Sequence, residues 1–148
     1  LAIDLEIQTL SEALSDSSFL KDKKAFFSWL GTAMYLSEDA VFMTLRDLAS
    51  FAAQGSEIVF DYTIPTHLLS LEERQAFNKV MRLTERKGET FKSFFEPQAF
   101  CDEVAQLGYN IIENQSPAEQ NERYFKNRSD NLMTHPISYN IHAEIVKR

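Results

Sequence analysis

The chain has 148 residues, of which 44% are hydrophobic and 25% are charged, and its formal net charge is −7. This balance is typical of one folded domain of ordinary size and argues against a disordered chain. The dispersed lysines and arginines argue against a nucleic-acid surface, which needs clustered cations, and no apolar run approaches the roughly 20 residues of a membrane-spanning helix.

The first part of the chain is predicted to contain a strand end, a short helix and a buried strand. Residues 2–5 (AIDL) are interpreted as the end of a strand, and residues 8–14 (QTLSEAL) have helical spacing. The lysine-rich segment 21–24 is interpreted as a solvated turn. The nearly continuous apolar run 25–30 (AFFSWL) is typical of a parallel strand that helices cover on both faces.

Two helices and a second strand are predicted in the middle of the chain. Ser37 is a good N-cap for a helix over residues 38–53, which begins with two acidic residues. Residues 57–62 (EIVFDY) predict the next strand. Ser70 and Glu73 have the spacing of a capping box, which predicts a long helix to about residue 86.

The last third of the chain predicts two more helices and two strands. Pro97 suits the first turn of a helix over residues 97–107, a strand follows over 109–113, and Ser116 with Glu119 forms another capping box. Apolar and polar residues alternate over 139–146, which predicts an antiparallel or edge strand with one wet face. The whole order predicts a mostly parallel α/β sheet with right-handed crossovers.

The single cysteine, Cys101, cannot form an internal disulfide and lies on an apolar helix face, so we interpret it as a buried space-filling residue. One unpaired cysteine favours a reducing compartment, and we expect a cytoplasmic protein. The histidines, His67, His135 and His142, are far apart and have no metal-ligand spacing, so no metal site is predicted.

Five segments, in matching order and spacing, resemble the leucine carboxyl methyltransferase family of class I S-adenosylmethionine-dependent methyltransferases. The most informative is the strand, turn and helix start over residues 29–36 (WLGTAMYL). The others are residues 3–6 (IDLE), 57–62 (EIVFDY), 93–97 (SFFEP), and 123–125 with 128–130 (RYF and RSD).

The resemblance implies a Rossmann-like sheet of seven strands in the order 3-2-1-4-5-7-6, with strand seven antiparallel. This chain is expected to supply only the C-terminal portion, strands 4-5-7-6, as a single partial domain over residues 1–148. Strands one to three are expected before Leu1, with the glycine-rich cofactor turn and the acidic residue that binds the ribose.

The resemblance also implies a set of cofactor-binding residues. Asp4 would accept a hydrogen bond from the adenine amine and Leu5 would pack against the ring, although Asp4 by itself is typical of a surface residue. Trp29, Leu30 and Gly31 follow a strand at the sheet end where α/β proteins bind ligands; core packing and a turn explain Trp29 and Gly31 equally well. Many relatives have a glutamate where Leu30 stands.

Four residues are candidates for the substrate side. Tyr35 and Tyr62 could position a nucleophile, although most tyrosines pack with a wet tip. The guanidinium groups of Arg123 and Arg128 would suit a carboxylate substrate, with ordinary salt bridges as the alternative. For Asp61, a hydrogen-bonded structural role is favoured over catalysis.

The resemblance implies methyl transfer from S-adenosyl-L-methionine to an oxygen or carboxylate of a small molecule or a peptide terminus, and we expect no nucleic-acid or membrane partner. This chain alone is expected to be inactive, or nearly so. The alternative is a non-enzymatic binding or oligomerisation domain that retains half of the fold. Without strands one to three, one apolar edge of segment 25–30 would be unpaired, which predicts self-association.

Overall fold

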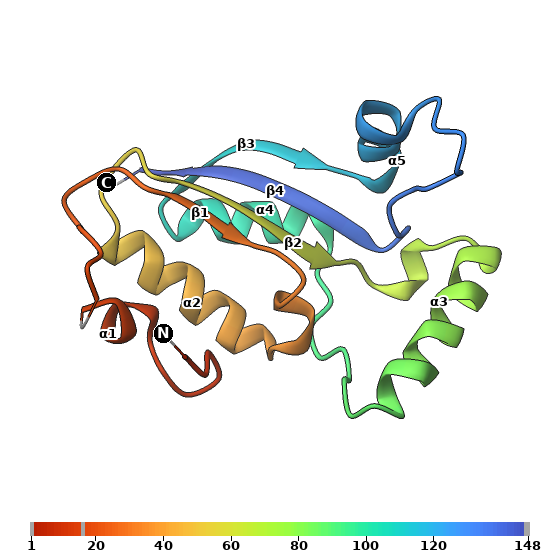
Figure 1. The fold of residues 1–148 in the computed structure, drawn as a ribbon, viewed down its shortest axis with the longest axis horizontal. Helices are drawn as coiled ribbons and strands as arrows, with labels where there is room; N and C mark the ends of the chain where they lie inside the picture. The colour runs from red at the N-terminus through yellow and green to blue at the C-terminus, as the bar shows by residue number, and fades with distance from the viewer. Residues whose placement is uncertain (1, 16, 147–148) are drawn as a thin grey trace.

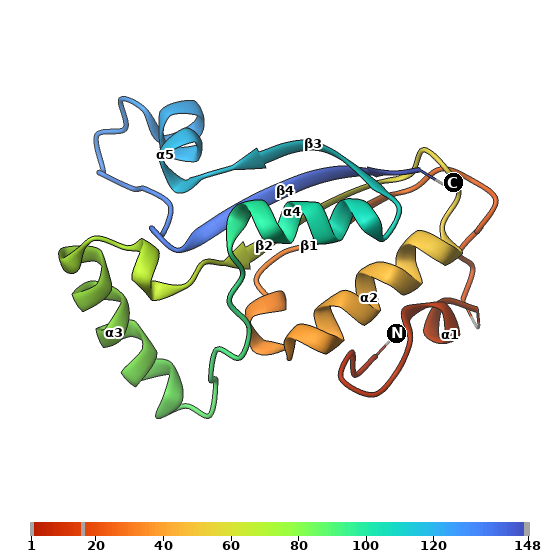
Figure 2. The same cartoon turned by 180° about the vertical axis from the view of Figure 1, so that it is seen from behind.

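The computed structural model describes residues 2–15 and 17–146, which form a four-stranded sheet with helices α2 and α4 on one side (Figure 1, Figure 2). The strands are β1 (Phe26–Trp29), β2 (Glu57–Thr63), β3 (Tyr109–Gln115) and β4 (Ser138–Ile145). The helices are α1 (Leu10–Ser15), α2 (Glu38–Phe51), α3 (Leu71–Glu85), α4 (Pro97–Gln106) and α5 (Pro117–Gln120). Two short 3-10 turns, η1 (Ala33–Tyr35) and η2 (Thr66–Leu68), and a π-helical turn, η3 (Asn121–Phe125), complete the elements.

The sheet has the order β1-β2-β4-β3. β1 and β2 are parallel, with Phe26 opposite Glu57 and Trp29 opposite Phe60. β4 is antiparallel to both β2 and β3. The antiparallel polarity predicted for the last strand is therefore confirmed, and the sheet is mixed rather than mostly parallel because β4 lies between β2 and β3.

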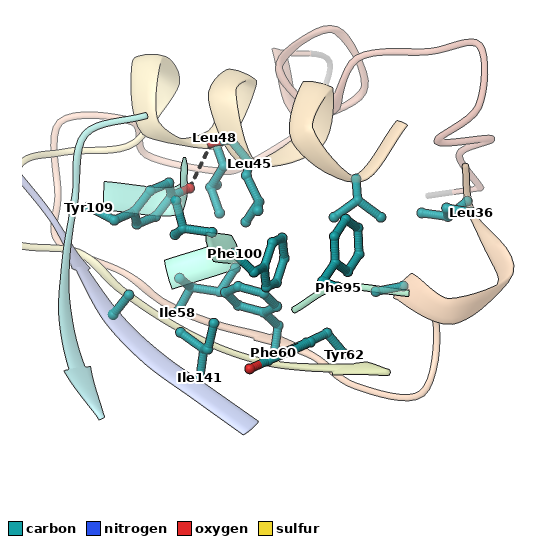
Figure 3. Packing of buried hydrophobic residues seen from close by; sticks show 14 of the residues in the cluster. Leu36, Leu45, Leu48, Ile58, Phe60, Tyr62, Phe95, Phe100, Tyr109 and Ile141 are labelled. Carbon is teal, nitrogen blue, oxygen red and sulfur yellow. Dashed lines mark hydrogen bonds between the residues drawn. The ribbon is translucent and has the colours of Figure 1, made fainter. Parts of the chain in front are cut away.

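The core lies between the sheet and the layer formed by α2 and α4 (Figure 3). Alternate residues of β2 and β4 point into this layer, where Phe60 and Ile141 are fully buried. The rings of Phe95 and Phe100 stack with their centroids 4.1 Å apart. The hydroxyl of Tyr109 donates to the carbonyl of Leu45 at 2.8 Å, a contact marked in Figure 3, and joins β3 to α2.

Short-range signals in the sequence place the helix starts correctly. The Ser37 side chain accepts a hydrogen bond from the N–H of Ala40 at the start of α2. Reciprocal capping boxes are present at Ser70 with Glu73 before α3 and at Ser116 with Glu119 before α5. These local hydrogen bonds satisfy N–H groups that the first helical turn leaves free.

The strand predicted over residues 25–30 forms, but the prediction that helices cover both of its faces is wrong for this chain. β1 is an edge strand that pairs with β2 alone among residues 2–15 and 17–146. Phe26 is 63% exposed and Leu30 is 54% exposed. An apolar run identifies a strand, but its place in the sheet depends on which other strands are available to pair with it.

The strand end predicted at residues 2–5 is also wrong. Residues 2–4 have no regular structure and a turn begins at Leu5. The carbonyl of Asp4 accepts from the N–H groups of Ile7 and Gln8, which closes this turn. No strand of the described residues pairs with this segment, and the N–H of Asp4 donates to Gln8 Oε1 at 3.0 Å.

Across the described ranges, no helix combines the length and apolarity that a membrane crossing requires.

Candidate functional site

The candidate site lies where the parallel strands β1 and β2 end side by side (Figure 1). Gly31 follows β1 with a φ of 69°, a left-handed conformation that glycine adopts without strain. Its N–H donates to Asp61 Oδ1 at 2.7 Å, so the carboxylate of β2 holds the turn that leaves β1. Burial raises the pKa of the Asp61 carboxyl, while this hydrogen bond opposes the shift.

An apolar pocket of about 180 Å³ lies along β1, between the N-terminal segment, β1 and α2. Its lining includes two of the predicted cofactor residues, Leu5 and Trp29, together with Ile3, Leu10 and Phe27. The Trp29 ring nitrogen Nε1 is buried and has no hydrogen-bond partner within residues 2–15 and 17–146. The structure therefore brings Leu5 and Trp29, from distant segments of the chain, to one pocket.

The other three predicted cofactor residues are exposed at the surface. Leu30 and Gly31 continue directly from Trp29, and Asp4 precedes Leu5. Asp4 Oδ1 accepts from the N–H of Glu6 at 3.0 Å, which gives Asp4 a part in the local turn. The side chain of Leu30 is more than half exposed.

Glu6 connects three segments of the chain through its carboxylate, and no pattern in the sequence identified it. Its Oε1 accepts from Lys92 Nζ at 2.9 Å and from the N–H of Ser37 at 3.0 Å, and its Oε2 accepts from Ser37 Oγ at 2.8 Å. The hydrogen bond from Lys92, followed by those from Ser37, lowers the pKa of Glu6 to about 2. The carboxylate thus joins the N-terminal segment to the start of α2 and to the loop after α3, across 31 and 86 residues of sequence that local patterns cannot span.

The two candidate tyrosines have different surroundings. Tyr35, in η1, is half-buried, and its ring lies edge-on to Phe91 with centroids 5.3 Å apart. Tyr62 is buried in the core, and its hydroxyl donates to Asn114 Oδ1 at 3.1 Å. Burial raises the pKa of Tyr62. Tyr35 lies near the turn after β1, whereas the hydroxyl of Tyr62 is already engaged inside the fold.

The two candidate arginines form ion pairs away from this turn. Arg123 in η3 donates to Glu113 Oε1 at 2.7 Å, and its guanidinium lies over the Tyr124 ring. Arg128 donates to both carboxylate oxygens of Asp130 and holds the pKa of that carboxyl below its ordinary value. Both arginines are exposed, so the contacts match the salt bridges that the sequence left open as an alternative.

Comparison with known proteins gives one family. Residues 1–49 match the model of the leucine carboxyl methyltransferase family. The chain is 32% identical over 132 residues to YktD of Bacillus subtilis (strain 168), whose name assigns it to the S-adenosyl-L-methionine-dependent methyltransferases. This match covers 89% of the chain and 43% of YktD, so the chain spans less than half of that relative.

Solved structures with the same fold are more distant in sequence. A DUF574 family protein from Streptomyces avermitilis superposes with a TM-score of 0.64 at 14% identity, covering 97% of this chain and 53% of that protein. An S-adenosylmethionine-dependent methyltransferase from Archaeoglobus fulgidus gives 0.57 at 16% identity, with 97% and 66% covered.

The sequence matches agree with the resemblance carried by residues 29–36, and the structural matches agree in fold. The chain therefore belongs to the leucine carboxyl methyltransferase family of S-adenosyl-L-methionine-dependent methyltransferases.

Proposed function

We propose that the protein to which this chain belongs transfers a methyl group from S-adenosyl-L-methionine to an oxygen or carboxylate of a small acceptor. In this proposal the chain supplies the C-terminal part of the catalytic domain, with β1, β2, β4 and β3 as strands 4-5-7-6 of a seven-stranded sheet. Bound S-adenosyl-L-methionine would supply a methyl group already activated on a sulfonium. The protein then has mainly to hold the acceptor in line with that methyl group.

The pocket lined by Leu5 and Trp29 is the observation that carries this proposal. Its volume of about 180 Å³ suits one ring system rather than a whole nucleoside cofactor, since an apolar cavity of about 150 Å³ accepts benzene. Leu5 and Trp29 offer apolar surface, and the adjacent Asp4 offers an exposed carboxylate. These groups suit an adenine ring with its exocyclic amine.

Calorimetric titration with S-adenosylhomocysteine tests whether S-adenosyl-L-methionine is the methyl donor. We expect binding by the gene product that contains this chain, and weaker or no binding and no turnover by the 148 residues alone. Leu5→Ala should weaken binding by about tenfold, since a large side chain leaves the ring's surroundings. Leu71→Ala is the matched control, because Leu71 is 72% exposed at the start of α3. Absence of binding in every form would contradict the proposal and favour a non-enzymatic binding or oligomerisation domain.

Self-association through β1 is the second part of the proposal. The outer edge of β1 has no partner strand within the described ranges, and Phe26 lies on it 63% exposed. Such an edge is a template for a strand of another molecule. Light scattering of the 148-residue chain should give a mass above that of a monomer, and Ser28→Lys should reduce it because a charge on an edge strand disfavours pairing. A strict monomer at high concentration would contradict this part.

A further inference from the structure

The segment formed by residues 2–8 supplies part of the wall of the pocket along β1 but belongs to no helix or strand. Ile3 and Leu5 of this segment line the pocket together with Trp29. The backbone hydrogen bonds that close the turn stay within the segment. These bonds fix the shape of the turn, so its place beside β1 must be fixed by other contacts.

Glu6 makes every hydrogen bond that joins this segment to a more distant part of the chain, among residues 2–15 and 17–146. Its Oε1 accepts from the N–H of Ser37 and from Lys92 Nζ, and its Oε2 accepts from Ser37 Oγ. Leu5 adds apolar contact with the core. Burial of Leu5 has no preferred direction, whereas hydrogen bonds do, so the Glu6 carboxylate orients the segment.

Both anchors of this carboxylate are held by other parts of the fold. Ser37 is the N-cap of α2, where its hydroxyl accepts from the N–H of Ala40 at 3.3 Å. A negative charge at this place also interacts favourably with the helix dipole. The backbone N–H of Lys92 donates to the carbonyl of Met34 at 2.7 Å. The two anchors therefore have positions that do not depend on the segment that Glu6 attaches to them.

The two anchors differ in strength. The hydrogen bond from Lys92, followed by those from Ser37, lowers the pKa of Glu6 to about 2, so Glu6 is a carboxylate at neutral pH. The side chain of Lys92 is 52% exposed and that of Glu6 is 30% exposed, and water weakens such an ion pair. Ser37 makes two hydrogen bonds from a residue fixed by α2. We therefore expect Ser37 to contribute more than Lys92.

We propose that Glu6 is a positioning residue for the methyl donor, and that its carboxylate holds residues 2–8 so that Asp4 and Leu5 meet the adenine ring. The contact with adenine rests on the proposed function, whereas the anchoring of the segment does not. Glu6 is absent from the lining of the pocket, and both of its oxygens are engaged by Ser37 and Lys92. It therefore acts through its neighbours in the chain.

Hydrogen exchange followed by mass spectrometry tests the anchoring on the gene product that contains this chain, with no ligand added. Glu6→Ala should speed exchange about tenfold over residues 2–8 and at Ser37, whose N–H loses its acceptor, since about one net hydrogen bond is lost. Peptides from β2 and β4 should not change. Glu122 in η3 forms an exposed ion pair with Lys126, so Glu122→Ala is the matched control. Unchanged exchange over residues 2–8 in Glu6→Ala would overturn the proposal.

Calorimetric titration with S-adenosylhomocysteine tests the role in binding. Glu6→Ala should weaken binding about tenfold, the loss expected when about one net hydrogen bond no longer holds the segment. Glu6→Gln should lie between this variant and the unaltered protein, because its amide oxygen can still accept one of the bonds. Both variants should melt only slightly below the unaltered protein. A lower melting temperature with unchanged affinity would mean a merely structural role and would overturn the proposal.

Lys92→Met separates the two anchors of Glu6. It should weaken binding of S-adenosylhomocysteine by roughly threefold, as expected for an exposed ion pair. Added to Glu6→Ala, it should cause no further loss, because its partner is already absent. Additive losses would mean that Lys92 acts independently of Glu6, against the proposal.

The two sets of measurements separate this inference from the proposed function. Faster exchange in Glu6→Ala, with no binding of S-adenosylhomocysteine by any form, would overturn the proposed methyl donor and the role of Glu6 in binding it. The anchoring of residues 2–8 would then stand alone. Binding of S-adenosylhomocysteine that Glu6→Ala leaves unchanged would overturn this inference alone.

Discussion

The two faces of the sheet differ in how fully the chain covers them. On the side of α2 and α4, Phe60, Ile141 and Ile145 have no exposed surface. On the opposite side, His142 Nε2 lies within hydrogen-bond distance of Glu57 Oε2, at 2.6 Å, and the exposed ring of Phe26 lies 6.3 Å from the His142 ring. The face covered by α2 and α4 therefore supplies most of the fold's stability. The opposite face and the strand ends can contact a ligand or another protein.

Removing a ring from the covered face should have the largest effect. Phe100 is 1% exposed and stacks on Phe95 between α4 and the sheet. Phe100→Ala should lower the free energy of unfolding by about 3–5 kcal/mol, because it removes apolar contact and leaves a cavity. Urea unfolding followed by circular dichroism measures the change.

Phe26→Ala is the matched variant on the open face. It should change the free energy of unfolding by no more than about 0.5 kcal/mol, since its ring is already largely in water. Equal losses for the two variants would contradict the distinction between the faces.

A change at the turn after β1 should have an intermediate effect. Gly31→Ala should cost about 1–2 kcal/mol, because its φ of 69° is unfavourable for a residue with a Cβ. Gly88→Ala is a matched control, since Gly88 has a φ of 79° and both glycines have open space where a Cβ would lie. Both variants should lose similar stability in urea unfolding, but Gly31→Ala alone should weaken binding of S-adenosylhomocysteine. Equal binding by both variants would remove Gly31 from the candidate site.

The smallest effect is expected at the surface contact that joins the N-terminal segment to α2. The pKa of Glu6 falls from 4.5 to about 2 on folding, so the contribution of the ionised carboxylate is complete above pH 4.5 and is lost as the pH falls through about 2. Glu6→Gln should therefore lower the melting temperature slightly at pH 7, and the difference from the unaltered protein should vanish near pH 2. Glu89→Gln, at an exposed loop residue, is the control. A difference that does not depend on pH would contradict a charge-based role for Glu6.

Local patterns were enough to predict most elements, since caps and periodicity act over a few residues. Ser37, Ser70 and Ser116 each precede a helix, and the alternation over 139–146 identified an antiparallel strand. The exposed face of β1 and the turn at residues 2–5 were missed because both depend on which distant elements lie beside these segments. The strand propensity of a residue reflects its own side chain and its close neighbours in sequence, so it does not show which distant elements will lie beside it.

The candidate site was predictable only in part, for a similar reason. Leu5 and Trp29 were found because the segments around them resemble a known family, and the structure brings both to one pocket. Glu6 was missed because its partners are 31 and 86 residues away.

The position of β4 has a consequence for how the chain is made. β4 is the last strand of this sequence, yet it is the one that joins β2 to β3. On the ribosome, β1 and β2 can pair early, but among the strands of residues 2–15 and 17–146 β3 pairs only with β4, which is made later. Until β4 is made, the edges of β2 and β3 that it joins are open, and open strand edges favour aggregation.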